Sequence, residues 1–337
     1  MKGKMMEFAQ ILEMAESGNA EAQSAARSMY LTGFKRSQKA IQAFEAYQKK
    51  KSAQVQSNEK LEYVRFRKCI RPLLRLLLFG QRKICGFEVE VLKQIRLPKK
   101  HPIIFAVSHI GKWDIEILYE QIPYHYYLVV SDFINTYGRI GGCFFNANGA
   151  IWVNEDSKQD KANTKEWMKQ ILKQGNNIMI FPEGTWNLSE NEIIRDIAYG
   201  TADAAIETGA AIIPIAVEQY VNRFVINIGD SLSFADFADK MNLTVALRDI
   251  LAALKWEIWE REGIQSRAEL PDTYWEDFIM KRRKEWPGYS MREQIINTYI
   301  PKEKLEYWQV QKDLKTGLLP KWYEMAVCEC IAEKAQI

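Results

Sequence analysis

The sequence has few of the residues that build covalent crosslinks and metal sites. Its cysteines are only Cys69, Cys85, Cys143, Cys328 and Cys330, an odd and scattered set with no C-x-x-C spacing. This excludes a disulfide framework and a paired-cysteine zinc site. We therefore expect reduced thiols in a cytoplasmic protein, and no metal.

Long hydrophobic runs are also absent. No stretch supplies the roughly 18–20 consecutive apolar residues that a membrane-spanning helix needs. The longest uncharged stretch in the middle of the chain, 140–154, contains three Gly and three Asn. The basic start of the chain is followed by acidic residues and by no small-residue cleavage site, so we expect no secretory signal. With 47% hydrophobic and 26% charged residues, the composition favours an ordinary folded protein over a disordered or fibrous one.

Two kinds of catalytic loop are missing. No G-x-S-x-G elbow occurs, which argues against a serine hydrolase, and neither G-x-G-x-x-G nor G-x-x-x-x-G-K-[ST] is present to bind a nucleotide. Ser108 does adjoin His109, but neighbouring side chains on a strand point to opposite faces. No recognisable nucleic-acid-binding module accompanies the basic residues, so we expect no nucleic-acid partner.

Charge is distributed unevenly along the chain. Residues 35–100 contain 18 Lys and Arg against 5 Glu, whereas the remainder has 28 against 38 acidic residues. A basic segment on an otherwise acidic protein favours an anionic surface such as phospholipid, nucleic acid or an acidic carrier. The alternative is a solvated helix face.

Within that segment, residues 61–80 alternate bulky apolar side chains with arginine and lysine. This pattern is typical of a helix that lies in a membrane interface, bound by its apolar face and attracted to anionic lipid. The alternative is a helix packed on the core, with its arginines extended towards solvent. Pro72 is expected either to kink this segment or to open a second helix.

Three domains are predicted: a helical segment over 1–56, an α/β domain over 61–235, and a helical C-terminal extension over 236–337. Parts of 15–41 resemble one Sel1-like repeat, a relative of the tetratricopeptide repeat, with Gly18 ending a first helix and Asn19 capping a second. A single repeat cannot bury its apolar face alone, so either it docks on something else or the match is chance. The polar residues 49–60 are interpreted as a linker.

The α/β class follows from the alternation of short β-like runs with helical ones. We expect a central mixed, largely parallel sheet flanked by helices. The expected strands are 87–92, 102–107, 126–130, 149–153, 177–181, 211–217 and 224–228. The expected helices between them are 114–121, 158–174 and 196–208. Pro214 interrupts one run, which suggests an edge strand or a bulge.

His109 is the most informative of three histidines, because His101 and His125 are interpreted as structural. It follows an apolar run and precedes Asp114 by five residues, about 500° along an ideal helix. The two side chains can therefore meet only if the chain turns at 110–112 and Asp114 faces back from a helix start. A carboxylate on one ring nitrogen would let the other nitrogen take a proton from a hydroxyl. Taken alone, the same spacing also occurs in purely structural pairs.

A second cluster follows the strand predicted at 177–181. There Pro182, Glu183, Gly184 and Thr185 place a carboxylate, a flexible backbone and a hydroxyl at the end of the strand. A plain junction between a strand and a turn would not require the glutamate.

These features, in this order, resemble the glycerolipid acyltransferase superfamily, whose type member is lysophosphatidic acid acyltransferase. The first block, H-x-x-x-x-D, runs from His109 to Asp114, although Ser108 replaces the usual Asn before it. The second block resembles 149–155, and the third, F-P-E-G-T, is intact at 181–185. The fourth block, a short apolar run around proline, resembles 212–215. The resemblance covers about residues 60–230.

The resemblance implies transfer of a fatty acyl group from an acyl thioester, on acyl carrier protein or coenzyme A, to a hydroxyl of a lipid acceptor. The expected acceptor is 1-acyl-glycerol-3-phosphate or a related lysolipid. His109 would be the general base and Asp114 would orient it, without a covalent intermediate or a cofactor. Glu183, Gly184 and Thr185 would contact the acceptor. Such an enzyme would lie peripherally on the cytoplasmic membrane face through residues 61–80.

Two departures from the family pattern bear on the acceptor. Glu155 and Trp186 stand where the family usually has arginines that bind the acceptor phosphate, a group that favours forked cationic donors. Either Lys112, Arg139 and Arg195 substitute for them, or the acceptor lacks the phosphate. A third possibility is a catalytically degenerate membrane or protein adaptor.

Overall fold

The structure is a computed structural model of the 337-residue chain, and it describes residues 20–93, 102–111, 113–131, 133–154, 157–187, 192–263, 271 and 273. Its centre is a seven-stranded sheet in the order β1-β7-β6-β2-β5-β3-β4. Only the β6–β7 pair is antiparallel among these strands. The predicted α/β class and the mixed, largely parallel sheet are confirmed.

The strands are β1 (Glu88–Val91), β2 (Ile103–Val107), β3 (Tyr126–Val130), β4 (Ile151–Trp152), β5 (Asn177–Ile180), β6 (Ala211–Tyr220) and β7 (Arg223–Ile228). The helices are α2 (Ala20–Ser57), α3 (Val64–Ile84), α4 (Asp114–Gln121), α5 (Phe133–Thr136), α6 (Ile140–Asn148), α7 (Lys158–Lys173), α8 (Gly200–Thr208) and α9 (Lys240–Glu262), with a 3₁₀ turn η1 (Phe234–Asp236). Each predicted strand and helix of the α/β domain has a counterpart here.

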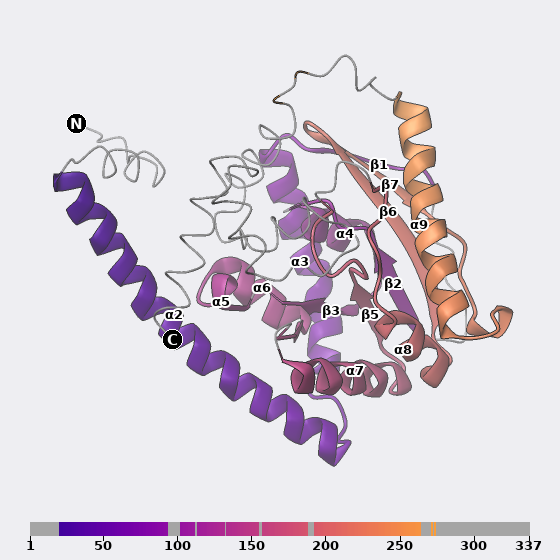
Figure 1. Cartoon of the computed structure of the whole chain (residues 1–337), viewed down its shortest axis with the longest axis horizontal. Helices are drawn as coiled ribbons and strands as arrows, with labels where there is room; N and C mark the ends of the chain where they lie inside the picture. Colours follow the sequence, from indigo (N-terminus) through magenta and orange to yellow (C-terminus); the bar gives the residue numbers. More distant parts are fainter. Residues whose placement is uncertain are drawn as a thin grey trace, which may run out of the picture.

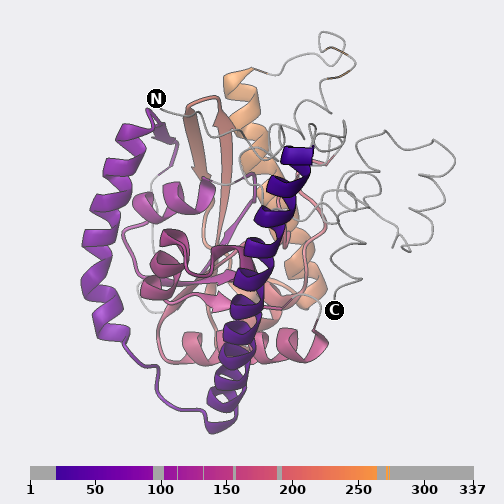
Figure 2. The same ribbon diagram turned by 90° about the vertical axis from the view of Figure 1, so that its left-hand side faces the viewer.

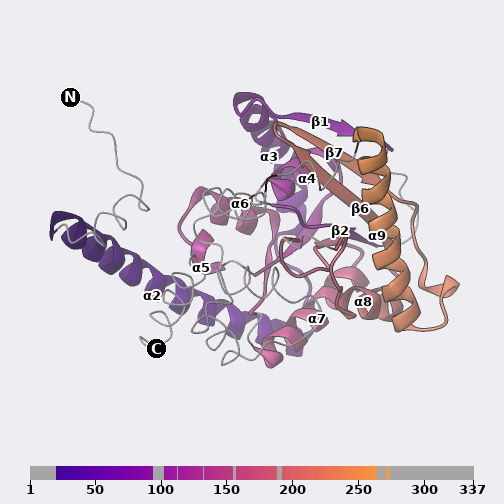
Figure 3. The ribbon, with the colours of Figure 1, turned by 45° about the horizontal axis from the view of Figure 1, so that its top comes forward.

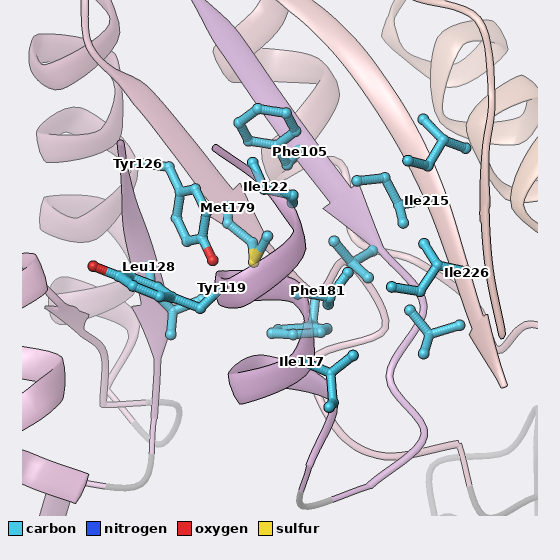
Figure 4. Close-up of a cluster of buried hydrophobic side chains, with 14 of the residues drawn as sticks. Phe105, Ile117, Tyr119, Ile122, Tyr126, Leu128, Met179, Phe181, Ile215 and Ile226 are labelled. Atoms are coloured by element: carbon cyan, nitrogen blue, oxygen red, sulfur yellow. The ribbon is translucent and has the colours of Figure 1, made fainter. Parts of the chain in front are cut away.

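Both faces of the sheet are covered, which gives three layers (Figures 1 and 3). The residues of β2 alternate between two cores, because successive side chains on a strand point to opposite faces. Phe105 packs beneath α3, α4 and α6, whereas Ile104 and Ala106 pack beneath α7, α8 and α9. Figure 4 shows the first of these cores, to which the sheet contributes Phe105 and Met179 and α4 contributes Ile117.

Pro214 lies in β6, a central strand between β7 and β2, so the predicted edge position is wrong. Its missing N–H is tolerated for a geometric reason. Ala211 donates its N–H to Pro102 O on the β2 side, so Pro214, three residues later, directs its nitrogen to the β7 side. There the regular β6–β7 ladder ends at the pair Ile215–Ile228, and pairing resumes at Ile212–Leu232 with two residues opposite three, as in a bulge.

Helix α2 packs across the end of the domain against α7 and α5 (Figure 2). Phe44 stacks on Phe133 with ring centroids 5.0 Å apart. Tyr47 Oη accepts the backbone N–H of Trp152 at 3.1 Å, so α2 covers the edge strand β4. The expectation that this helical segment docks on another part of the chain is confirmed, whereas the Sel1-like repeat stays a prediction because its first helix lies outside the described residues.

The linker predicted at 49–60 is wrong over most of its length, because α2 continues to Ser57. The run of three lysines that suggested solvent exposure contains Lys51, whose side chain is 1% exposed. Its ammonium donates to Asp160, to Thr164 Oγ1 at 2.7 Å and to Trp152 O at 2.8 Å. Burial lowers the pKa of Lys51, and the Asp160 carboxylate opposes that shift.

Helix α3 runs without interruption through Pro72, so no second helix opens there. Leu74 and Leu78 pack in the core, as the core-packed alternative expects, but not all of its arginines extend towards solvent. Arg71 is buried with Leu74 and Leu78, while five large apolar side chains are 42–65% exposed: Phe66, Leu73, Leu76, Leu77 and Phe79. No helix in the described ranges is long and apolar enough to cross a membrane.

The predicted C-terminal extension is helical over α9, which covers β6 and β7. Asp239 caps this helix by accepting the N–H of Asn242 at 2.9 Å. Residues beyond 263, apart from 271 and 273, lie outside the described residues, as do His101, Lys112 and Glu155.

Candidate active site

His109 and Asp114 meet at the carboxyl end of β2. His109 Nδ1 lies 2.7 Å from Asp114 Oδ2, and the Asp114 side chain is fully buried while the His109 side chain is 14% exposed. An ionised carboxylate only accepts hydrogen bonds, so Nδ1 carries the proton and Nε2 presents a lone pair. Nε2 has no hydrogen-bond partner within the described part of the chain.

The pair forms because the chain turns between the strand and the helix, as predicted. Asp114 is the first residue of α4, and its Oδ2 also accepts the backbone N–H groups of Ile110 at 3.0 Å and Gly111 at 3.2 Å. These amides are oriented by the same turn that brings the imidazole back over the helix start. The carboxylate therefore fixes the backbone and the ring together.

Glu183 supports His109 from the other side. Its two carboxylate oxygens accept the N–H of His109 and the N–H of Arg195, each at 3.0 Å, and the residue is 7% exposed. Burial raises the pKa of the Glu183 carboxyl, and the charge of Lys255 and the two backbone donors offset this only in part. The structure thus places Glu183 beside His109, with both of its carboxylate oxygens bonded to backbone N–H groups, and its contact with the acceptor stays a prediction.

Gly184 and Thr185 follow in the turn that closes this loop. Gly184 donates its N–H to Phe181 O at 3.0 Å and has φ +76°, a left-handed conformation that favours glycine. A side chain at Gly184 would meet no atom, so the backbone angle alone explains this glycine. Thr185 is half-buried beside it.

Two aromatic rings flank the His109 imidazole. Phe181 stacks on it with ring centroids 4.0 Å apart, and Trp186 meets it edge-on at 6.1 Å. Trp186 is 7% exposed, so an indole occupies the position where the resemblance expects an arginine. The sequence marked Trp186 only as a departure from the pattern, and it gave no indication that Phe181 stacks on the base.

Of the three cations predicted to bind the phosphate, the structure describes two, and it does not bring them together in the site. Arg195 is held next to the site through its backbone contact with Glu183, and its half-buried side chain has no partner among the described residues. Arg139 is exposed at the start of α6, which follows β3 at the same edge of the sheet, and no described contact joins it to His109. Lys112 lies outside the described residues.

Ser108 is not available as a nucleophile. It is fully buried, and its Oγ accepts the N–H of Val217 on β6 at 3.0 Å. Its backbone N–H donates to Ile215 O, so both of its groups hold the end of β2 against β6. Within the described residues, no group of three His, Cys, Asp or Glu side chains could hold a metal ion.

Comparison with known proteins agrees with this geometry. Residues 88–218 match the family model described as "Acyltransferase", which spans β1 to β6 and contains both His109 and Glu183. The part of the chain from β1 to β6 is therefore similar in sequence to acyltransferases.

Its relatives carry related names. The chain is 23% identical over 61% of its length to the 1-acyl-sn-glycerol-3-phosphate acyltransferase of Borreliella burgdorferi, of which the match covers 76%. It is 25% identical over 44% of its length to the 1-acyl-sn-glycerol-3-phosphate acyltransferase alpha of Ovis aries, of which the match covers 51%. Among solved structures, it is similar to the 1-acyl-sn-glycerophosphate acyltransferase PlsC from Thermotoga maritima. The TM-score is 0.49 at 13% identity, over 71% of this chain and 99% of that chain.

Proposed function

We propose that this chain transfers a fatty acyl group from a thioester to a hydroxyl of a lysolipid, with His109 as general base. The observation that carries the proposal is the His109–Asp114 contact of 2.7 Å with Nε2 left for substrate. The named relatives, which are 1-acyl-sn-glycerol-3-phosphate acyltransferases, support a phosphorylated lysolipid as the acceptor.

The reaction divides into two proton transfers around one acyl transfer. Nε2 takes the proton of the acceptor hydroxyl as its oxygen attacks the thioester carbonyl carbon. Asp114 stabilises the imidazolium that forms and holds the ring in the productive tautomer. When the carbon–sulfur bond breaks, the imidazolium returns the proton to the leaving thiolate. No covalent acyl-enzyme is needed, because the histidine activates the acceptor itself.

The general-base role is tested by His109→Ala, with His125→Gln as a matched control at the other described histidine. We expect His109→Ala to lower kcat by about a hundredfold or more, because general-base catalysis contributes that much. The circular dichroism spectrum should be unchanged, and His125→Gln should retain activity. A folded His109→Ala protein with wild-type turnover would refute the assignment.

A non-phosphorylated acceptor is the second candidate, and the observation that favours it is the buried Trp186 beside His109. An indole carries no charge with which to form an ion pair with a phosphate, whereas the Arg195 guanidinium can form one if its side chain turns into the site. Purified enzyme should be assayed with 1-acyl-glycerol-3-phosphate and with monoacylglycerol, each with acyl-coenzyme A and acyl carrier protein donors. Preference for the phosphorylated acceptor that Arg195→Gln abolishes supports the first candidate; preference for monoacylglycerol supports the second.

Trp186→Arg provides an internal check on this choice. The ratio of kcat/KM for the two acceptors within one variant cancels any general loss of folded enzyme. We expect the ratio to shift towards the phosphorylated acceptor, because a guanidinium replaces an apolar ring beside the base. An unchanged ratio would mean that the acceptor head group does not reach residue 186.

We also propose that the protein rests on the cytoplasmic face of a membrane through α3. The exposed stripe that includes Leu73, Leu76 and Leu77 supplies an apolar face, and the exposed Arg65 and Lys68 supply positive charge. Such a helix binds at the level of the lipid head groups, and more strongly when the lipid is anionic.

Vesicle flotation tests this placement with variants that leave the buried side of α3 intact. Leu76→Glu/Leu77→Glu should abolish flotation with phosphatidylglycerol vesicles, since both side chains are at least 60% exposed. Val245→Glu, at a 48% exposed residue of α9 on the opposite face of the sheet, is the control and should float like wild type. Equal flotation of all three proteins would contradict the proposal.

A further inference from the structure

Two arginines of α3 bind the carboxyl-terminal end of α4. Arg71 donates from Nη2 to Ile122 O at 2.6 Å, and Arg75 donates from Nε to Glu120 O at 2.8 Å. The last carbonyls of a helix have no partner inside that helix and carry the negative end of its dipole. Guanidinium groups therefore satisfy these carbonyls and neutralise them.

A third arginine extends the same contact. Arg82 Nε lies 2.7 Å from Glu120 Oε2, and its Nη1 donates to Phe87 O at 3.1 Å. Arg71, Arg75 and Arg82, which we call the arginine clamp, thus all engage α4 or the segment beside it. The clamp uses the side of α3 that faces the protein, while the apolar stripe occupies its exposed side.

Arg71 is the most deeply buried member of the clamp and makes several contacts. It is 3% exposed, and its guanidinium carbon lies 4.0 Å from the ring centroid of Tyr119 and 4.6 Å from that of Tyr126. Its Nη1 also lies 3.4 Å from Asn148 Oδ1 on α6. A buried cation needs several such partners, and only a planar fork can stack on rings and bind carbonyls at once.

The other end of α4 is the catalytic end. Asp114 is the first of the eight residues of α4, so about 12 Å of regular helix separates the clamp from the carboxylate. Intrahelical hydrogen bonds make so short a helix move as one body. A shift or rotation at Tyr119–Ile122 is therefore transmitted to the contact between Asp114 and His109.

We infer that Arg71 is a positioning residue for the His109–Asp114 pair, acting through α4. The inference rests on the proposed function for the role of His109. The geometry that it concerns can nevertheless be measured without any substrate. A purely structural arginine would change stability and leave the hydrogen bond of the imidazole unaltered.

Three variants test the inference in the full-length protein. Arg71→Met removes the clamp's central contacts, Arg71→Lys keeps the charge but loses the fork, and Lys83→Met is the matched control at an exposed basic residue of α3. Spectra that correlate ring ¹⁵N with ring ¹H report which imidazole nitrogen carries the proton. The sequence has only three histidines to assign, and Asp114→Asn shows how the lost contact looks.

We expect a single His109 tautomer in wild type and in Lys83→Met, and a mixture in Arg71→Met. Acyl transfer should fall about tenfold to a hundredfold in kcat, as expected for an ångström-scale misplacement, with little change in the KM of the donor. Arg71→Lys should recover part of both signals. Wild-type tautomer and kcat in a folded Arg71→Met protein would overturn the inference.

Two further outcomes remain decisive. If Arg71→Met does not fold, Arg75→Met, which loses one carbonyl contact on a half-buried residue, should show the same changes to a smaller degree, and an unaltered tautomer there would overturn the inference. If the tautomer is disturbed while acyl transfer is unchanged, the positioning stands and the general-base assignment under the proposed function fails.

Discussion

The buried lysine of α2 gives the sharpest stability prediction. Lys51→Met removes an ammonium whose donors all reach acceptors: Asp160, Thr164 Oγ1 and Trp152 O. The Asp160 side chain is 5% exposed and would retain only the N–H of Asn154, at 2.8 Å, as a described partner. Removing one partner of a buried ion pair costs about 3–5 kcal/mol, because the remaining charge is left without compensation.

The neighbouring lysine supplies the control. Lys50 pairs with Glu62 at 3.3 Å, but its side chain is 63% exposed, and exposed pairs contribute about 0–1 kcal/mol. Both variants remove one lysine from adjacent positions of one helix. Any difference between them therefore reports burial rather than charge.

Urea unfolding followed by circular dichroism and tryptophan fluorescence measures the two costs. We expect Lys51→Met to lower the midpoint strongly with an unchanged slope, and Lys50→Met to leave it nearly unaltered. The double variant Lys51→Met/Asp160→Asn removes both charges of this buried pair, so it should be more stable than Lys51→Met alone. Equal costs at Lys50 and Lys51, or a double variant weaker than the single one, would refute the reasoning.

Three further predictions concern Asp114 and Glu183 of the site and the buried His125. Asp114→Asn should lower kcat by about two to four orders of magnitude in steady-state assays, because an amide stabilises the wrong tautomer of His109. Burial raises the pKa of the Glu183 carboxyl above its ordinary value of 4.5. The stability that Glu183 contributes is therefore fully present below pH 4.5 and is lost as the pH rises through its pKa in the folded protein. Over that range, urea titrations should show wild type losing stability relative to Glu183→Gln. Burial lowers the pKa of His125 to about 4, so wild type should lose about 3 kcal/mol between pH 6.5 and that value, and His125→Gln should remove this acid-dependent loss.

The strands of the α/β domain were predictable because their side chains alternate between two cores. The run that becomes β2 is apolar throughout, as expected for a parallel strand covered on both faces, and its buried residues all belong to one of the two clusters. The His109–Asp114 contact was predictable for a different reason. Five residues exclude a shared helical face, which left a turn before α4 as the only way to join them.

Other features depended on contacts that the sequence does not display. The run of lysines at 49–51 looks solvated, and only the acceptors on β4 and α7 make Lys51 a core residue. Helix α6 was missed because glycine and asparagine at 140–154 weaken helical periodicity, and α5 has only four residues. The sequence left open which face of α3 is buried. An arginine can be buried in place of a leucine where helix carbonyls accept hydrogen bonds from its guanidinium group, as they do for Arg71.

The cover that Tyr47 provides for Trp152 has a consequence for dissecting this protein. β4 lies at one end of the sheet, and its backbone N–H at Trp152 is bonded to a side chain of α2 rather than to another strand. A fragment trimmed to the segment shared with other acyltransferases would expose β4 as an unprotected edge strand, which could pair with a strand of a second molecule. Such a fragment should precipitate or form oligomers, so the N-terminal helix protects solubility as well as adding stability.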